Sequence, residues 1–156
     1  MLLSYSATEQ VADAIRRAIR KEVDQFVSGQ CWWAEPLKFY DCPGKLAGET
    51  RVTIGISSDD DLLMATDEIL IIAEQLEHLS AEYGIDWQLA LAGQGIGEIR
   101  EGKPDSVLAK LLEGFDRCLD RKLGKGVERM ARLVETHDRY RSDARRSTDG
   151  YVPRRR

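Results

Sequence analysis

Little in the sequence suits a membrane protein or a small domain held together by disulfides or metal. The chain has 156 residues, with three cysteines, two histidines and four prolines. No run approaches the ~20 apolar residues that a membrane helix needs, and the first residues show no secretory signal. We therefore expect a cytoplasmic protein without a membrane partner, in which free thiols pack as small hydrophobes. A chain of this length can bury an ordinary core without covalent or metal staples.

Local motifs of catalysis and nucleotide binding are missing as well. There is no C-x-x-C and no G-x-S-x-G, and the glycines at Gly93, Gly95 and Gly97 do not have the spacing of a dinucleotide-binding loop. His78 and His137 have no local partner pattern, although a triad assembled from distant positions stays open. The sequence therefore favours a non-enzymatic protein that needs no cofactor.

The charge is divided unevenly along the chain. Residues 1–115 hold 20 acidic and 10 basic side chains, a net charge of −10. Residues 116–156 hold 7 acidic and 13 basic side chains, a net charge of +6. An acidic body attracts a basic partner, chiefly by raising the rate of association. We therefore expect the partner to be another protein, of basic character.

The spacing of apolar residues predicts both helices and strands. Apolar residues at three- and four-residue steps predict helices, alternation predicts strands, and a run rich in aromatics favours a pleated surface. Ser6 or Thr8 is the expected cap of the first helix. Pro36 cannot donate a ladder hydrogen bond, so the strand that contains it is expected at an edge, bulged or split. The predicted helices cover about 7–27, 60–83, 104–123 and 127–140, and the predicted strands cover about 31–40, 51–57, 86–91 and 96–99.

These elements predict an α+β fold. We expect a small mixed sheet of about four strands packed with four helices, in the order α-β-β-α-β-β-α-α. The strand at 51–57, the long helix and the strand at 86–91 are expected to form a β-α-β unit, right-handed if the strands are parallel. Residues 1–141 are predicted to be a single domain. Residues 142–156, rich in Arg, Ser, Asp and Gly, are predicted to be a flexible arm.

The aromatic run supplies the preferred candidate for a binding surface. Trp32 and Trp33 point to opposite faces of the predicted strand, so one of them, together with Tyr40, is expected in an exposed patch. Exposed aromatics are frequent binding anchors, and Glu35 and Asp41 would supply charges at the rim. The alternative is that helices cover both faces and bury both tryptophans. We predict a module that occupies a protein partner, as an immunity-type inhibitor, small chaperone or adaptor, with a homodimer also possible.

The acidic run Asp59, Asp60 and Asp61 supports an alternative prediction. It follows a predicted strand and opens a helix, a position where open α/β sheets often bind ligands. Three carboxylates can supply hard oxygen donors to Mg²⁺, which would suit a small metal-dependent enzyme. Ordinary helix capping accounts for the same residues, because carboxylates are favourable at the positive end of the helix dipole.

The arginine-rich arm supports the other alternative, a nucleic-acid-associated protein. The planar guanidinium binds phosphate through two donors, and Tyr140 and Tyr151 could stack on bases. Acidic residues interrupt the arm and no known base-reading module accompanies it. The candidate contacts are Arg139, Arg141, Arg145, Arg146, Arg154, Arg155 and Arg156.

Overall fold

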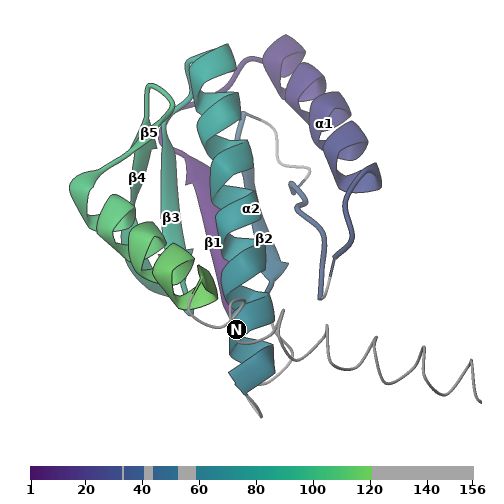
Figure 1. Ribbon diagram of the computed structural model, residues 1–156. Helices are drawn as coiled ribbons and strands as arrows, with labels where there is room; N and C mark the ends of the chain where they lie inside the picture. Colours follow the sequence, from purple (N-terminus) through teal and green to yellow (C-terminus); the bar gives the residue numbers. More distant parts are fainter. Residues whose placement is uncertain (33, 41–43, 53–58, 121–156) are drawn as a thin grey trace, which may run out of the picture. The chain divides into compact units, whose positions relative to one another are not determined.

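The computed structural model describes residues 1–32, 34–40, 44–52 and 59–120, with only the backbone of 59–63 (Figure 1). Met1–Leu119 form one compact unit, and Asp120–Arg156 belong to a second. No helix in the described part of the chain is long and apolar enough to cross a membrane. The elements are β1 (Leu2–Ala7), α1 (Asp13–Ser28), β2 (Ala47–Arg51), α2 (Asp59–Tyr83), β3 (Trp87–Leu91), β4 (Gln94–Arg100), β5 (Lys103–Pro104) and a last helix over 106–120.

The strands form one sheet in the order β2-β1-β3-β4-β5. All neighbouring pairs are antiparallel. The predicted α+β class is therefore confirmed, with an antiparallel sheet in place of the mixed one. Because β2 and β3 both run antiparallel to β1, they are parallel to each other. The predicted β-α-β unit is thus split, with β1 inserted between its two strands.

The start of the chain differs most from the prediction. Leu2–Ala7 form strand β1, which lies between β2 and β3 in the sheet, whereas this region was predicted to lead into a helix. Helix α1 begins only at Asp13, and Ala12 precedes it without a side-chain cap, so the predicted Ser6 or Thr8 cap is wrong. The alternation of apolar and polar residues in β1 is short. A longer helical pattern follows it, so the sequence did not predict a strand there. The end of α1 at Ser28, followed by Gly29, is as predicted.

The aromatic segment 31–40 is not a strand in its described residues. It instead lies along the outer edge of β2 and makes two backbone hydrogen bonds there. The Tyr40 N–H donates to the Ala47 carbonyl at 2.7 Å, and the Glu35 N–H donates to the Arg51 carbonyl at 3.2 Å. Pro36 lies between these bonds and has no N–H, which prevents a regular ladder. The edge position expected from Pro36 is therefore correct, although the strand is not.

The second half of the described chain follows the prediction closely. Helix α2 ends at Tyr83, and Gly84 has the positive φ of 64° that terminates helices readily. β3 and β4 form the predicted hairpin, and β5 is a short addition. The predicted strand at 51–57 is wrong in its start, since β2 covers Ala47–Arg51. Several predicted ranges lie outside the described residues. They are 53–57 of the predicted strand, 121–123 of the helix predicted at 104–123, the helix predicted at 127–140 and the arm at 142–156.

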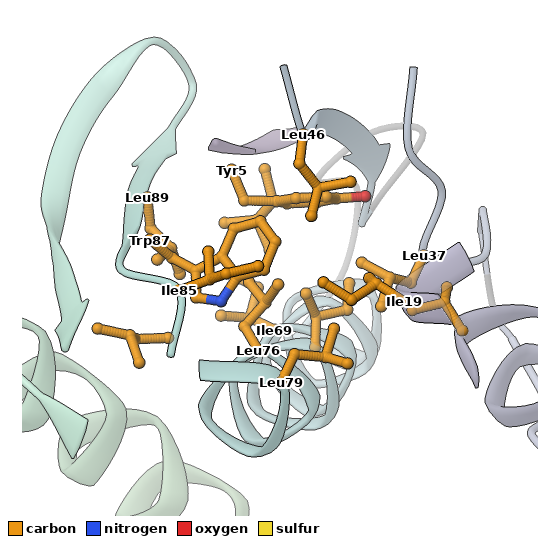
Figure 2. Packing of buried hydrophobic residues seen from close by; sticks show 14 of the residues in the cluster. Tyr5, Ile19, Leu37, Leu46, Ile69, Leu76, Leu79, Ile85, Trp87 and Leu89 are labelled. Carbon is orange, nitrogen blue, oxygen red and sulfur yellow. The ribbon is translucent and has the colours of Figure 1, made fainter. Parts of the chain in front are cut away.

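The core lies between the sheet and α2 (Figure 2). Trp87 and Tyr5 contribute the largest buried side chains from the sheet, and Ile69, Leu76 and Leu79 face them from α2. The helix over 106–120 adds the buried Leu108, and α1 adds Ile19 and Val23. Full burial of such a side chain contributes about 1.5–3 kcal/mol. The helices therefore cover one face of the sheet.

The buried hydroxyl of Tyr5 joins the sheet to the segment along its edge. The Tyr5 hydroxyl donates to the Lys38 carbonyl at 2.7 Å and accepts the Lys38 N–H at 3.1 Å. It also shares a hydrogen bond of 2.8 Å with Thr50 Oγ1. Burial raises the pKa of Tyr5 to about 12, because the charged phenolate would be desolvated. A hydrogen bond from the same segment also reaches α2, where the Glu68 carboxylate accepts the Ala34 N–H at 3.0 Å.

Tyr5→Phe is predicted to destabilise the fold by about 1–3 kcal/mol at neutral pH, because it leaves the part-buried backbone groups of Lys38 and the buried Thr50 hydroxyl without this partner. The folded pKa of about 12 exceeds the ordinary value of 10.0, so the stability linked to this proton is complete below pH 10. That stability falls as the pH rises from 10 towards 12, by about 3 kcal/mol in total.

Urea denaturation of wild type and Tyr5→Phe across this alkaline range should show their difference shrinking. Tyr40→Phe, at an exposed tyrosine, is the control and should show little change at neutral pH. A constant difference between wild type and Tyr5→Phe from neutral to alkaline pH would contradict the role given to the Tyr5 hydroxyl.

Gly48→Ala is predicted to destabilise the fold by about 1–3 kcal/mol, because the added methyl overpacks the site. A Cβ on Gly48 would lie 1.9 Å from the Lys38 carbonyl oxygen and 2.7 Å from Tyr5 Cε2. Gly95→Ala is the matched control, since a Cβ there meets nothing within 4 Å. Thermal and urea unfolding measure both variants, and equal stabilities would refute the close packing at Gly48.

Candidate binding site on the open face of the sheet

The face of the sheet opposite the core carries small and polar residues. Leu3 and Tyr5 of β1 are buried against the helices, so the alternate residues Ser4 and Ser6 point the other way. The register places these serines in two rows that cross the sheet. The rows are Glu49–Ser4–Ala90–Gly95 and Ala47–Ser6–Gln88–Glu98. We call the surface formed by these eight residues the open face.

A groove of about 610 Å³ runs over the open face. Most of the residues on its floor have small side chains, with Gln88 as the larger exception, and its two ends carry acidic residues. Tyr40 and Glu49 lie at the β2 end, and Glu98 and Asp105 lie at the β4 end. None of the described residues that line the groove is basic. The groove therefore presents negative charge at both ends and little steric obstruction between them.

Tyr40 and Glu49 form a hydrogen-bonded pair at the β2 end. The Tyr40 hydroxyl donates to Glu49 Oε2 at 2.7 Å, and Tyr40 is 41% exposed. The hydrogen bond to the Glu49 carboxylate raises the pKa of Tyr40, so the phenol stays protonated at neutral pH. The Tyr40 backbone is fixed by its bond to Ala47, and the Arg20 guanidinium donates to its carbonyl at 2.6 Å. This end of the groove is consequently held in place from several sides.

Glu98 and Asp105 are held as carboxylates at the β4 end. Gln88 Nε2 donates to Glu98 at 3.2 Å and Arg100 pairs with it, and these two contacts lower the pKa of Glu98. Asp105 accepts backbone N–H groups from Leu108 at 2.8 Å, Glu98 at 2.9 Å and Val107 at 2.9 Å. These bonds lower the pKa of Asp105, led by the one from Leu108. Groups that are firmly ionised at neutral pH are better suited to electrostatic recognition than to proton transfer.

The structure distributes the predicted aromatic anchors unequally. Tyr40 lines the groove, whereas Trp32 is half-buried, donates its indole N–H to the Val27 carbonyl at 3.1 Å and packs edge-on against Phe26. Glu35 pairs with Lys38 at 2.9 Å and accepts the Arg51 N–H, and these bonds lower the pKa of Glu35. Trp33 and Asp41 lie outside the described residues. Of the described candidates, only Tyr40 therefore belongs to the groove.

The residues of the two alternatives fall largely outside the described structure. Helix α2 begins at Asp59, but the side chains of Asp59, Asp60 and Asp61 are not described. Among the described side chains, no group of three His, Cys, Asp or Glu residues is arranged to hold a metal ion. The metal prediction therefore stays a prediction. The arm also lies outside the description, with its candidate contacts Arg139, Arg141, Arg145, Arg146, Arg154, Arg155 and Arg156.

The described histidine and the two described cysteines lie away from the groove. His78 Nε2 is 3.0 Å from a Glu22 carboxylate oxygen, and the Tyr83 hydroxyl donates to the other oxygen at 2.8 Å. These contacts tie α1 to α2. Cys31 and Cys118 are free and exposed. None of these residues lines the groove.

Sequence reasoning missed most of the groove. Ser4 and Ser6 were not expected in a strand, and no sequence motif marks Glu98 or Asp105 as part of a site. The alternation of Leu3 and Tyr5 with Ser4 and Ser6 was the available signal. It covers too few residues to stand out without the rest of the sheet.

Comparisons with known proteins found no match. No family model, curated protein or solved structure matches the chain. The interpretation of the groove therefore rests on its own geometry and charge.

Asp105→Ala is predicted to destabilise the fold by about 1–2 kcal/mol, because it removes the N-cap of the helix over 106–120 and the bond to Glu98. Asp105→Asn should cost less, since Asn also caps helices. The folded pKa of Asp105 is lowered, so its contribution is present above the ordinary carboxyl pKa and is lost as the pH falls through the folded value.

Urea denaturation at neutral and acid pH should therefore show the cost of Asp105→Ala shrinking in acid. Asp116→Ala, at an exposed position on the same helix, serves as the control. Equal stability of Asp105→Ala and Asp116→Ala would exclude the capping role.

Proposed function

We propose that this chain is a non-enzymatic protein-interaction module that binds and occupies a basic macromolecular partner through the open face. The observation that carries this proposal is the groove itself, which is lined by Glu49, Glu98 and Asp105 and by no basic residue among those described. Complementary charge raises the rate of encounter and selects against acidic partners. The net charge of −10 over residues 1–115 extends the same attraction beyond the groove.

The state of the groove's charged groups supports binding over catalysis. Glu98 and Asp105 each accept hydrogen bonds that lower their pKa values, so neither is poised to exchange protons near neutral pH. Tyr40 supplies an exposed aromatic ring beside a carboxylate, an arrangement that suits a cationic side chain. An inhibitor of the immunity type, a small chaperone or an adaptor in the cytoplasm would each work in this way.

Charge argues against a second copy as the occupant of the groove. Two open faces placed together would bring carboxylates towards carboxylates, and like charges at an interface cost several kcal/mol by order of magnitude. A homodimer of this chain would therefore use another surface.

The arginine-rich arm favours nucleic acid as a second candidate partner. Residues 116–156 carry 13 basic and 7 acidic side chains. Nucleic-acid binding of this kind weakens steeply with salt, because counterions are released from the phosphates. The acidic groove repels a polyanion, so this second function would depend on the arm alone.

Affinity capture from an extract of the source organism tests the proposed function. The full-length chain is expected to retain a basic protein at low salt and to release it at high salt, because exposed charges are screened. Tyr40→Ala and Glu49→Gln should each reduce the amount captured by about tenfold, the effect of losing one anchor or charged pair. Mass spectrometry identifies and quantifies the retained protein.

Glu113→Gln is the charge-matched control, because Glu113 lies on the helix over 106–120 and pairs only with Arg117 among the contacts found for it. It should capture as much as wild type. A retained set that is the same for wild type, Tyr40→Ala and Glu49→Gln would refute the proposed function.

A further inference from the structure

We propose that the groove receives an extended segment of the partner that crosses the strands and places two arginines, four residues apart, at its two acidic ends. This inference rests on the proposed function and names the chemistry that the open face recognises. One arginine would lie at Tyr40 and Glu49, and the other at Glu98 and Asp105.

The floor of the groove admits a peptide backbone. Between the acidic ends lie Ser4, Ser6, Ala47, Ala90 and Gly95, which have small side chains or none. Gln88 also lies there, and its side chain is held beside the β4 end by its hydrogen bond to Glu98. Nothing lies within 4 Å of the position that a Cβ on Gly95 would occupy. The volume of about 610 Å³ falls within the range of about 300–1,000 Å³ that is typical of binding pockets. A visiting chain can therefore lie close to the sheet.

The register of the strands fixes the spacing of the two arginines. Glu49 is on β2 and Glu98 is on β4, so three steps between neighbouring strands separate them. Glu98 is also in the row of Ala47, two residues along the strand from Glu49. At about 4.8 Å for each step across the strands and about 3.4 Å for each residue along them, the acidic ends lie about 16 Å apart. An extended chain advances about 3.4 Å for each residue, so four residues span about 14 Å and five span about 17 Å. Only residues an even number apart point to the same side of an extended chain, so four is the even spacing nearest to this distance.

The β2 end is built for a guanidinium group. The Tyr40 ring offers a π face, and the adjacent Glu49 carboxylate uses only Oε2 for its hydrogen bond to Tyr40. Arginine can stack on such a ring and at the same time donate to a carboxylate through its planar fork. Lysine supplies a point charge and lacks this two-pronged geometry.

The β4 end attracts a cation through an excess of negative charge. Glu98 and Asp105 bring two carboxylates, and Arg100 neutralises one of them. Asp105 keeps its charge because its bonds come from uncharged backbone N–H groups. We expect this end to bind more weakly than the end formed by Tyr40 and Glu49.

The test measures binding of synthetic peptides to the full-length chain by fluorescence anisotropy at low salt. Peptides of alternating Thr and Val carry two arginines either four or three residues apart, with the same composition and charge. The four-residue spacing should bind about tenfold more tightly, because only it directs both guanidinium groups into the groove. Replacement of both arginines with lysines should weaken binding.

Variants of the protein locate the two contacts. Glu49→Gln and Glu98→Gln should each weaken binding of the four-residue peptide, by about tenfold for the first and less for the second. Glu113→Gln is the control and should bind as wild type does. Glu49→Lys should lose the arginine peptide and gain affinity for a peptide in which glutamate replaces one arginine, a gain that an unfolded variant does not produce.

The outcomes separate this inference from the proposed function. Equal binding of both spacings, or no effect of Glu49→Gln and Glu98→Gln, overturns the inference, while a partner captured through Tyr40 keeps the proposed function. Failure of every peptide to bind also overturns the inference. Loss of specific capture in the extract experiment is what refutes the proposed function.

Discussion

The hydroxyl of Tyr5 connects the core of this protein to its binding surface. The ring belongs to the buried face of β1, and the hydroxyl bonds to both backbone groups of Lys38. Two residues further along the chain, Tyr40 reaches the rim of the groove and binds Glu49. The place of Tyr40 therefore depends on a hydrogen bond made inside the core. This link can form because Gly48 leaves room for the two segments to meet.

The two sides of β1 face two different chemical environments. Leu3 and Tyr5 lie in the apolar layer under α2, and Ser4 and Ser6 lie on the open face. The same alternation sorts β3, where Trp87 and Leu89 are buried and Gln88 and Ala90 line the groove. A change of one residue in the register would place serines in the core and leucines in the groove. Stability and recognition thus depend on the same pairing of strands.

Long periodic patterns in the sequence were sufficient to predict much of the fold. The twenty-five residues of α2 and the hairpin after it follow the predicted ranges closely, because many residues contribute to each pattern. β1 is six residues long, and its neighbour in the sheet, β2, lies forty residues later. Local propensity could not predict that β1 pairs with β2. Without this pairing, the residues that form the floor of the groove could not be predicted.

The candidate site was predictable only in its charge and in one residue. Tyr40 follows from the aromatic run, and the acidic character follows from composition. One of Trp32 and Trp33 was expected at the surface. Trp32 is half-buried and packs on Phe26, because its segment contacts the end of α1 instead of forming a strand. Glu98 and Asp105 meet through the turn between β4 and the last helix, a tertiary arrangement that composition does not encode.

The close approach of Lys38 to Gly48 has a consequence for the thermodynamics of recognition. A loop that must become ordered when a ligand arrives loses conformational entropy, and this loss weakens the complex. Here the chain leading to Tyr40 is already fixed by the folding reaction through Tyr5, Ala34 and Ala47. The aromatic rim is therefore pre-organised, and most of its ordering cost is met before any partner is present.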